Sequence, residues 1–174
     1  SPESVQRYAL HAADYMVRRG IKLLVVACNT ASAVALEILQ QKLAPIPVIG
    51  VVEPGAAAAV VLSKQHRYLV LATEATTQRR AYTKAIRNID ANAQVEALPC
   101  SLLVALAEEG WHAGAVAEAV ANQYLRGIAQ RPAAERPDVA ILGCTHFPLL
   151  TGPIARALGP DIQIVDSATT TAAA

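Results

Sequence analysis

Short apolar runs alternate with longer segments of helical periodicity along this 174-residue chain, and this alternation constrains the fold most. The strongest runs lack polar alternation, which is typical of strands that are covered on both faces in a parallel sheet. These runs are residues 23–27, 48–52, 68–72 and 139–142, with weaker strands expected at 95–98 and 162–165. Helices are expected over residues 2–19, 30–43, 76–89, 101–109 and 113–129, with an alanine-rich helix after 53–55. The order predicts an α/β fold with mostly parallel strands.

Composition argues against several classes of protein. Lys and Arg number 15 and Asp and Glu number 14, so no nucleic-acid partner held by a basic face is expected. No apolar run approaches the roughly 18 residues of a membrane span, so no membrane association is expected. The three cysteines form no Cys-x-x-Cys pair. This pattern favours a reducing cytoplasm over a disulfide framework or a zinc-finger module.

The same kind of turn follows two of the predicted strands. The sequence Cys-Asn-Thr at 28–30 follows the run 23–27, and Cys-Thr-His at 144–146 follows the run 139–142 and one glycine. Reactive groups gather beyond the carboxyl ends of parallel strands. Free N–H groups at the start of the following helix can bind a carboxylate and lower the pKa of a thiol. The two thiols are 116 positions apart in sequence, and an α/β sheet or two lobes could still bring them to face each other.

Each feature also has a structural explanation. A lone cysteine after a buried strand is most often a small core residue, and Cys100 is expected to have that role. The matched polar turns favour chemistry for Cys28 and Cys144 instead. A histidine after a strand is more often structural, but a neighbouring thiol favours a functional His146. A metal site built from Cys28, Cys144 and His146 is a further alternative, although no metal is expected.

Several segments resemble those of the glutamate racemase family, in the same order and over nearly the whole chain. The two cysteine segments together are the most specific, and the Thr-His-Phe-Pro run resembles glutamate racemases rather than aspartate racemases or related decarboxylases. The matching segments are Ala-Cys-Asn-Thr-Ala-Ser-Ala at 27–33, Leu-Ala-Thr-Glu-Ala-Thr at 71–76, Glu-Glu-Gly-Trp at 108–111, Gly-Cys-Thr-His-Phe-Pro-Leu-Leu at 143–150 and Val-Asp-Ser at 165–167.

The resemblance implies an isomerase that interconverts L- and D-glutamate without a cofactor and supplies D-glutamate for peptidoglycan, and thereby for cell-wall biogenesis and cell shape. It implies glutamate as the small-molecule partner and the cytoplasm as the location, and it leaves a homodimer open. The residues agree, because no lysine lies in a context that suggests a Schiff base and no glycine-rich phosphate loop is present. Pyridoxal phosphate is therefore not expected.

The resemblance also implies roles for individual residues. Cys28 and Cys144 would be the two acid/base residues, His146 would assist Cys144, and Glu108 would orient the histidine. Substrate contacts are expected from Asn29, Thr30, Thr73, Thr76, Thr145 and His146.

Two pseudo-symmetric, doubly wound lobes are implied as well. Turn signals at 54–55 and 159–160 predict a first lobe made of residues 1–52 plus 162–174 and a second lobe of residues 53–161. The family's chains carry a further strand and an Asp-Ser-Gly turn before this region and a further helix after it. The first lobe is therefore expected to be incomplete. Alternatives are an aspartate-racemase-type racemase or decarboxylase, or an inactive ligand-binding fragment.

Overall fold

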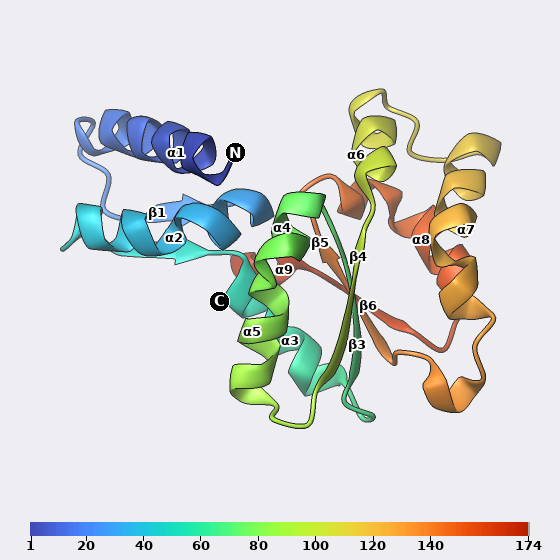
Figure 1. Ribbon diagram of the computed structural model, residues 1–174. Helices are drawn as coiled ribbons and strands as arrows, with labels where there is room; N and C mark the ends of the chain where they lie inside the picture. The colour runs from blue at the N-terminus through green and yellow to red at the C-terminus, as the bar shows by residue number, and fades with distance from the viewer. Residues whose placement is uncertain (174) are drawn as a thin grey trace.

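The computed structural model describes residues 1–173 and contains two sheets in which every strand pairing is parallel (Figure 1). In the smaller sheet β1 (Leu24–Val26) pairs with β2 (Val48–Gly50). The larger sheet has the order β4-β3-β5-β6. Its strands are β3 (Arg67–Ala72), β4 (Gln94–Pro99), β5 (Val139–Gly143) and β6 (Gln163–Asp166). The α/β class with parallel strands, predicted from the alternation, is confirmed.

Helices connect the strands and cover the larger sheet on both faces. Helices α6, α7 and α8 lie on one face, and α3 and α5 lie on the other (Figure 1). The helices within the described residues are α1 (Pro2–Val17), α2 (Asn29–Leu43), α3 (Val52–Leu62), α4 (Glu74–Arg79), α5 (Ala81–Ile89), α6 (Ser101–Glu108), α7 (Ala115–Ala129), α8 (Thr151–Leu158), α9 (Ser167–Ala172) and the 3-10 helices η1 (Ala133–Glu135) and η2 (Phe147–Leu150).

The two central strands of the larger sheet are buried on both faces. Leu69 and Leu71 of β3 point into the core beneath α6, α7 and α8. Tyr68 and Val70 of the same strand point into the core beneath α3 and α5. Successive side chains of a strand face opposite sides, so a strand covered on both sides needs apolar residues at every position. This explains why these runs show no polar alternation.

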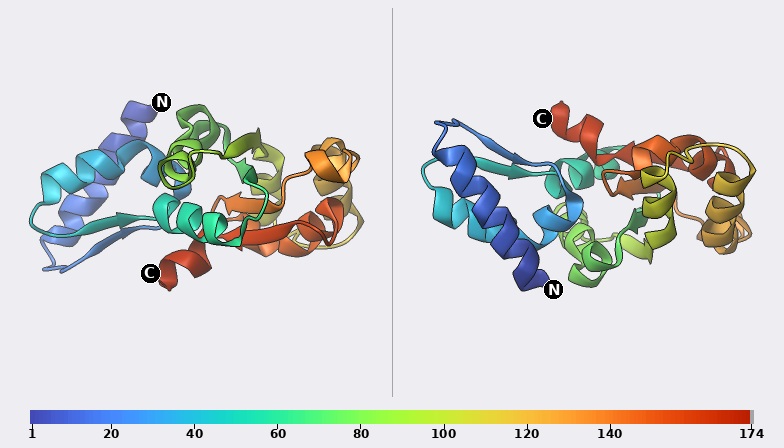
Figure 2. Two further views of the ribbon diagram at one scale, coloured as in Figure 1. Left: turned by 90° about the horizontal axis from the view of Figure 1, so that it is seen from below. Right: turned by 90° about the horizontal axis from the view of Figure 1, so that it is seen from above.

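The smaller sheet differs from its prediction. Val25 of β1 and Ile49 of β2 have exposed fractions of 45% and 38%, so these strands are not covered on both faces. Helices α1 and α2 pack against one side only, through a core that includes Val26, Leu39 and Val48. Both views of Figure 2 show these N-terminal elements together on one side of the molecule. The apolar runs predicted that β1 and β2 are covered on both faces, but the described helices cover only one face of this sheet.

The C-terminal strand also departs from the predicted lobes. Strand β6 pairs with β5, so residues 163–166 belong to the larger sheet and not to the first lobe as predicted. Pro54 and Gly55 lie in the first turn of α3 rather than in a separating turn, because proline is tolerated there. The division of residues 1–52 and 53–161 into lobes stays a prediction.

The helix predicted over residues 76–89 is broken in two. Arg80 has a φ of 53°, in the left-handed region, and it both ends α4 and begins α5. The hydroxyl of Thr73 accepts a hydrogen bond from the N–H of Thr76 and caps α4. A short helix thus starts directly at the carboxyl end of β3 and presents Thr73 and Thr76 there.

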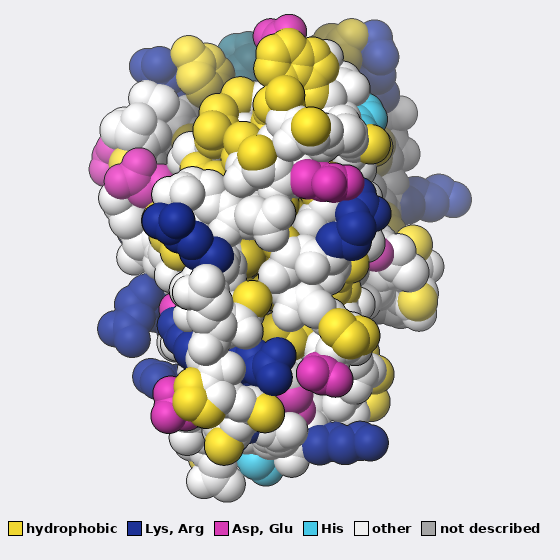
Figure 3. Space-filling view, turned by 90° about the vertical axis from the view of Figure 1, so that its right-hand side faces the viewer, with side chains coloured by type: hydrophobic (Ala, Val, Ile, Leu, Met, Phe, Trp, Pro, Cys, Tyr) yellow, Lys and Arg dark blue, Asp and Glu magenta, His cyan; other side chains and the backbone are white. Residues whose placement is uncertain are grey.

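Charges of both signs lie interspersed on the face drawn in Figure 3, and hydrophobic side chains gather toward its upper end. Exposed hydrophobic residues on α6 and η2, which contact each other, include Leu102 and Leu149, with exposed fractions of 50% and 52%. None of the helices formed by residues 1–173 has both the length and the hydropathy needed to span a membrane.

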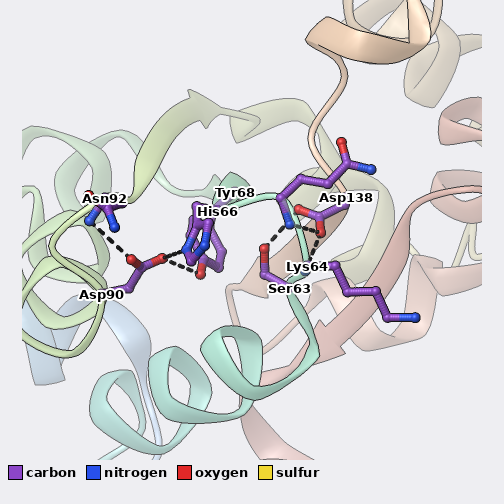
Figure 4. A network of polar contacts seen from close by, with 8 residues as sticks. Ser63, Lys64, His66, Tyr68, Asp90, Asn92 and Asp138 are labelled. Atoms are coloured by element: carbon purple, nitrogen blue, oxygen red, sulfur yellow. Dashed lines mark hydrogen bonds and ion pairs between the residues drawn. The ribbon is translucent and has the colours of Figure 1, made fainter.

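Acidic side chains fix the loops at the amino ends of the larger sheet (Figure 4). Asp138, just before β5, accepts hydrogen bonds from the Ser63 hydroxyl at 2.9 Å and from the backbone N–H groups of Lys64 and Gln65 at 2.6 and 2.9 Å. Asp90 accepts a hydrogen bond from the Tyr68 hydroxyl at 2.8 Å. This end is held by a polar network, and the opposite end carries the cysteine turns.

Candidate active site

The two cysteine turns meet where the sheets adjoin. Cys28 follows β1 and is the N-cap residue of α2, where it is exposed. Cys144 follows β5 and is buried, with an exposed fraction of 6%. The hydroxyl of Thr145 donates a hydrogen bond to the carbonyl oxygen of Ala27 at 3.3 Å. The residue after one cysteine therefore contacts the residue before the other, and the structure brings both thiols to one junction.

A histidine and a glutamate accompany Cys144. The sulfur of Cys144 lies 3.6 Å from Nδ1 of His146. The other ring nitrogen, Nε2, pairs with Oε1 of Glu108 at the end of α6. A carboxylate on Nε2 fixes the ring and directs Nδ1 toward the thiol. The arrangement resembles the general pattern of a nucleophile, a base and a group that orients the base, and it joins the three residues that were predicted to act together.

The acidity of Cys144 depends on several neighbours. Burial raises the pKa of the Cys144 thiol, because the charged thiolate loses solvation. The backbone N–H of His146 acts in the opposite direction, a negative charge on Cys28 raises the pKa further, and the backbone N–H of Thr145 lowers it. The net pKa lies above its ordinary value. The influence of Cys28 on this pKa is consistent with the contact between the two cysteine turns.

Three threonine hydroxyls converge beside the cysteine turns. The Oγ1 atom of Thr30, in the first turn of α2, lies 2.9 Å from that of Thr73 and 3.1 Å from that of Thr76. Thr73 and Thr76 are 3.0 Å apart. A hydroxyl can both donate and accept, so these three can turn their hydrogens toward a bound carboxylate. The starts of α2 and α4 thus form one polar corner, as the predicted substrate contacts require.

Asn29 occupies a more enclosed position than the prediction implied. Its side chain is buried, with the residue 2% exposed. Its oxygen accepts a hydrogen bond from the Tyr82 hydroxyl at 2.6 Å, and its nitrogen donates to the Ser167 hydroxyl at 3.1 Å. Sequence reasoning missed Tyr82 and Ser167 as neighbours of the site. The rule that reactive groups lie beyond the carboxyl ends of parallel strands (the strand-end rule) could have found Ser167, because this residue follows β6. Tyr82 lies inside a helical pattern that is typical of core residues.

Cys100 stands apart from this site. It lies in the core with no exposed surface, beside residues of α6 and α7. Burial raises the pKa of its thiol to about 12. Within residues 1–173, no group of three or more His, Cys, Asp and Glu side chains is arranged to hold a metal ion.

Comparison with known proteins places this geometry in a family. The profile of the Asp/Glu/Hydantoin racemase family matches residues 1–174. A glutamate racemase of Geobacter metallireducens is 49% identical over 172 residues, which cover 99% of this chain and 62% of that protein. The chain therefore spans about three fifths of the length of the curated relatives that it matches.

Solved structures agree with the sequence comparison. A glutamate racemase isoform of Bacillus anthracis superposes with a TM-score of 0.92 at 36% identity, covering 99% of this chain and 63% of that one. The glutamate racemase of Francisella tularensis, solved in complex with D-glutamate, superposes with a TM-score of 0.90 at 32% identity, covering 99% and 62%. On its sequence and its fold, this chain belongs to the Asp/Glu/Hydantoin racemase family.

Proposed function

We propose that the whole protein interconverts L-glutamate and D-glutamate without a cofactor, with Cys28 and Cys144 as its two acid/base residues. The observation that carries the proposal is the contact between the cysteine turns, in which Thr145 bonds to Ala27 at 3.3 Å. Glutamate as the substrate is favoured by the names of the relatives that match nearly the whole of this chain.

The chemistry needs two bases because racemisation removes the Cα proton from one face and returns a proton to the other. The thiolate of one cysteine takes the proton, and the electron pair of the broken C–H bond passes to the α-carboxylate. The thiol of the other cysteine then donates its proton to the opposite face. The reverse reaction exchanges the two roles. Each sulfur must approach Cα to roughly 3–3.5 Å for such transfers.

Polar groups around the thiols hold the substrate. The hydroxyls of Thr30, Thr73 and Thr76 converge at the start of α2, whose first backbone N–H groups are free to bind an anion. Thr145 adds a hydroxyl from the other turn. These donors suit the carboxylates of an amino dicarboxylic acid, and Asn29 supports the same corner from beneath. Contacts to carboxylates that gain charge in the transition state contribute to rate as well as to binding.

His146 and Glu108 complete the machinery on the Cys144 side. Cys144 is buried and its pKa is raised, so it needs a base before it can remove a proton near neutral pH. Nδ1 of His146 lies within reach of the sulfur, and Glu108 holds the far side of the ring. The imidazole therefore takes the thiol proton when Cys144 acts as base. When Cys144 acts as acid, its thiol donates its own proton to Cα and becomes the thiolate.

The proposed biological role is the supply of D-glutamate for peptidoglycan in the cytoplasm, which would support cell-wall biogenesis and cell shape. Free glutamate is the proposed small-molecule partner, and a homodimer is the proposed assembly. Growth of a strain that lacks this protein should then require D-glutamate in the medium. Growth without that supplement would contradict the biological role and leave the chemistry to be tested in vitro.

The direct test follows the circular dichroism of L-glutamate and of D-glutamate incubated with the whole purified protein. Both signals should decay to zero, and in heavy water the product should carry deuterium at Cα. The same assay with L- and D-aspartate separates the alternatives. Turnover of aspartate alone would indicate an aspartate-racemase-type enzyme. Glutamate binding by calorimetry without turnover would indicate a ligand-binding protein, and either result would overturn the proposal.

A further inference from the structure

A buried tyrosine lies between the two cysteine turns. Tyr82 is the second residue of α5 and has an exposed fraction of 2%. Its hydroxyl is 2.6 Å from Oδ1 of Asn29, the residue after Cys28. Its ring packs against Gly143, the residue before Cys144, where an added Cβ would lie 2.9 Å from Cε2 of the ring. One side chain therefore touches the neighbours of both cysteines.

The direction of the hydrogen bond fixes the orientation of the Asn29 amide. An amide oxygen only accepts, so the Tyr82 hydroxyl must donate its proton to it. The amide nitrogen is then turned toward Ser167, whose hydroxyl accepts at 3.1 Å. Burial raises the pKa of the Tyr82 hydroxyl, which keeps this donor protonated. Helices α5, α2 and α9 are thereby joined through one buried chain of three side chains.

Close packing leaves Tyr82 little freedom. Gly55 of α3 also faces its hydroxyl, at 3.2 Å from the position of an added Cβ. Glycine at 55 and at 143 thus makes room for the ring and its hydroxyl. A side chain held in this way can transmit a fixed position from the larger sheet to the first turn of α2. Cys28 is the N-cap residue of that turn.

We propose that Tyr82 is a positioning residue, which through Asn29 sets the placement of Cys28 relative to Cys144. The proposal rests on the proposed racemisation, because only a two-base reaction requires both sulfurs to be placed against one carbon. Tyr82 itself touches neither substrate nor the reacting atoms. It acts on the Cys28 side, since its hydroxyl bonds to the residue next to that cysteine, while its ring only fills space beside Gly143.

The test compares Tyr82→Phe with Tyr68→Phe in the whole protein. Each variant keeps its ring and loses one buried hydroxyl that donates a single hydrogen bond. Tyr68 is 1% exposed and bonds to Asp90 at the opposite end of the sheet. Tyr82→Phe should lower kcat for glutamate racemisation about tenfold, which corresponds to about 1.4 kcal/mol of barrier, with KM nearly unchanged. Tyr68→Phe should leave both kcat and KM within twofold.

A substrate with a leaving group shows which cysteine is affected. Glutamate that carries chlorine on Cβ loses its Cα proton to one cysteine, the electron pair forms the Cα=Cβ bond, and chloride leaves. The resulting enamine hydrolyses to 2-oxoglutarate and ammonia. The enantiomer that still reacts with the Cys144→Ser variant is the one served by Cys28. Tyr82→Phe should slow this enantiomer at least fivefold more than its mirror image, whereas Tyr68→Phe should leave the ratio unchanged.

An activity-independent measurement separates failure of this inference from failure of the proposed function. Hydrogen exchange of the peptide that covers residues 28–36 should be faster in Tyr82→Phe and unchanged in Tyr68→Phe. An unchanged enantiomer ratio in an active enzyme would overturn the positioning role of Tyr82. Faster exchange in a protein that never racemises glutamate would keep the structural link and overturn the proposed function. Unchanged exchange in such a protein would overturn both.

Discussion

The two cysteine turns both place a cysteine and then polar residues after a strand, but their surroundings are very different. Cys28 is exposed and starts a helix of 15 residues. Cys144 is buried, is followed by the four-residue 3-10 helix η2, and has His146 within 3.6 Å of its sulfur. The first turn has the free N–H groups at the start of a long helix. The second turn has an imidazole beside its thiol and a carboxylate that pairs with the imidazole. In the proposed reaction the two thiols have mirror-image tasks, and different neighbours surround each of them.

The unequal surroundings of Cys28 and Cys144 affect how readily each thiol could lose its proton in the proposed reaction. The free-energy profile of a racemase is symmetric in its substrates, which are mirror images, but it need not be symmetric in its catalytic groups. In the proposed reaction Cys144 loses its proton against a raised pKa, and the His146–Glu108 pair is proposed to offset that cost. Substitutions can test whether both cysteines are required for racemisation and whether only Cys144 depends on a neighbouring imidazole and carboxylate.

The largest effect is expected from replacing either cysteine. In the whole protein, Cys28→Ser and Cys144→Ser should each lower racemisation at least a thousandfold, which corresponds to about 4 kcal/mol of barrier. A hydroxyl is a far weaker acid than a thiol and cannot hold the required charge near neutral pH. Circular dichroism of both enantiomers of glutamate measures the loss. With a substrate that carries a leaving group on Cβ, one variant should process one enantiomer and the other variant its mirror image. Loss of both half-reactions in a single variant would indicate damage to the fold.

A smaller effect is expected from the helpers of Cys144. His146→Asn should lower kcat about a hundredfold, in the range of general acid–base catalysis. Glu108→Gln should lower kcat about tenfold, because the proposed role of Glu108 is only to orient the ring. Glu109→Gln is the matched control, since Glu109 adjoins Glu108 but, within residues 1–173, makes no hydrogen bond or ion pair with the histidine. In the assay of chloride elimination, the rate should fall most for the enantiomer whose Cα proton is taken by Cys144. Equal losses for both enantiomers would show that the pair serves both cysteines and not Cys144 alone.

Much of this arrangement could be predicted from the sequence because it follows local rules. Apolar runs gave the strands β3 and β5, and the strand-end rule pointed to Cys28 and Cys144. The coverage of β1 could not be predicted, since a run of apolar residues does not say how many helices lie over it. The break at Arg80 carried no glycine or proline signal. The pairing of β6 with β5 is a non-local choice that residue patterns do not encode.

The site shows the same limit. Threonines and a histidine next to strand ends were identified as candidates, and the structure places them together; their roles stay predictions. The sequence did not point to Tyr82 because its proposed role depends on residues that are distant in sequence and adjacent in the fold. Within α5 it occupies an apolar position like any core residue. Only three-dimensional contact with Asn29 and Gly143 distinguishes it.

The amino end of β5 provides a further contrast with its carboxyl end. Burial acts to raise the pKa of Asp138, but hydrogen bonds from Lys64, Ser63 and Gln65 outweigh it and hold the pKa below its usual value of 3.8. A carboxylate with a lowered pKa stabilises the fold above its unfolded-state pKa and loses that effect as the pH falls through the folded value. Asp138→Asn should therefore cost about 1–2 kcal/mol near pH 7 and progressively less below about pH 4.

Urea unfolding of Asp138→Asn and the unchanged protein at several pH values measures this difference. The racemisation rate per folded molecule should not change, because Asp138 lies at the end of β5 away from Cys144. A constant stability difference from pH 7 to pH 3 would contradict the assigned role of the carboxylate. A lowered rate per folded molecule would show that the two ends of the strand are coupled.

Among the three thiols, the smallest effect on rate is expected at Cys100, which shows how a cysteine without a polar turn behaves. Cys100 has no exposed surface, and its pKa is raised to about 12 by burial, so almost none of it is thiolate at neutral pH. Cys100→Ala should leave kcat and KM within a few-fold, while loss of the buried sulfur lowers the free energy of unfolding by about 1 kcal/mol. Steady-state racemisation and urea unfolding measure the two quantities. Because Cys100 is as buried as Cys144, burial alone cannot explain a catalytic thiol. If Cys100→Ala inactivated the folded enzyme while Cys144→Ser did not, the assignment of the two bases would be wrong.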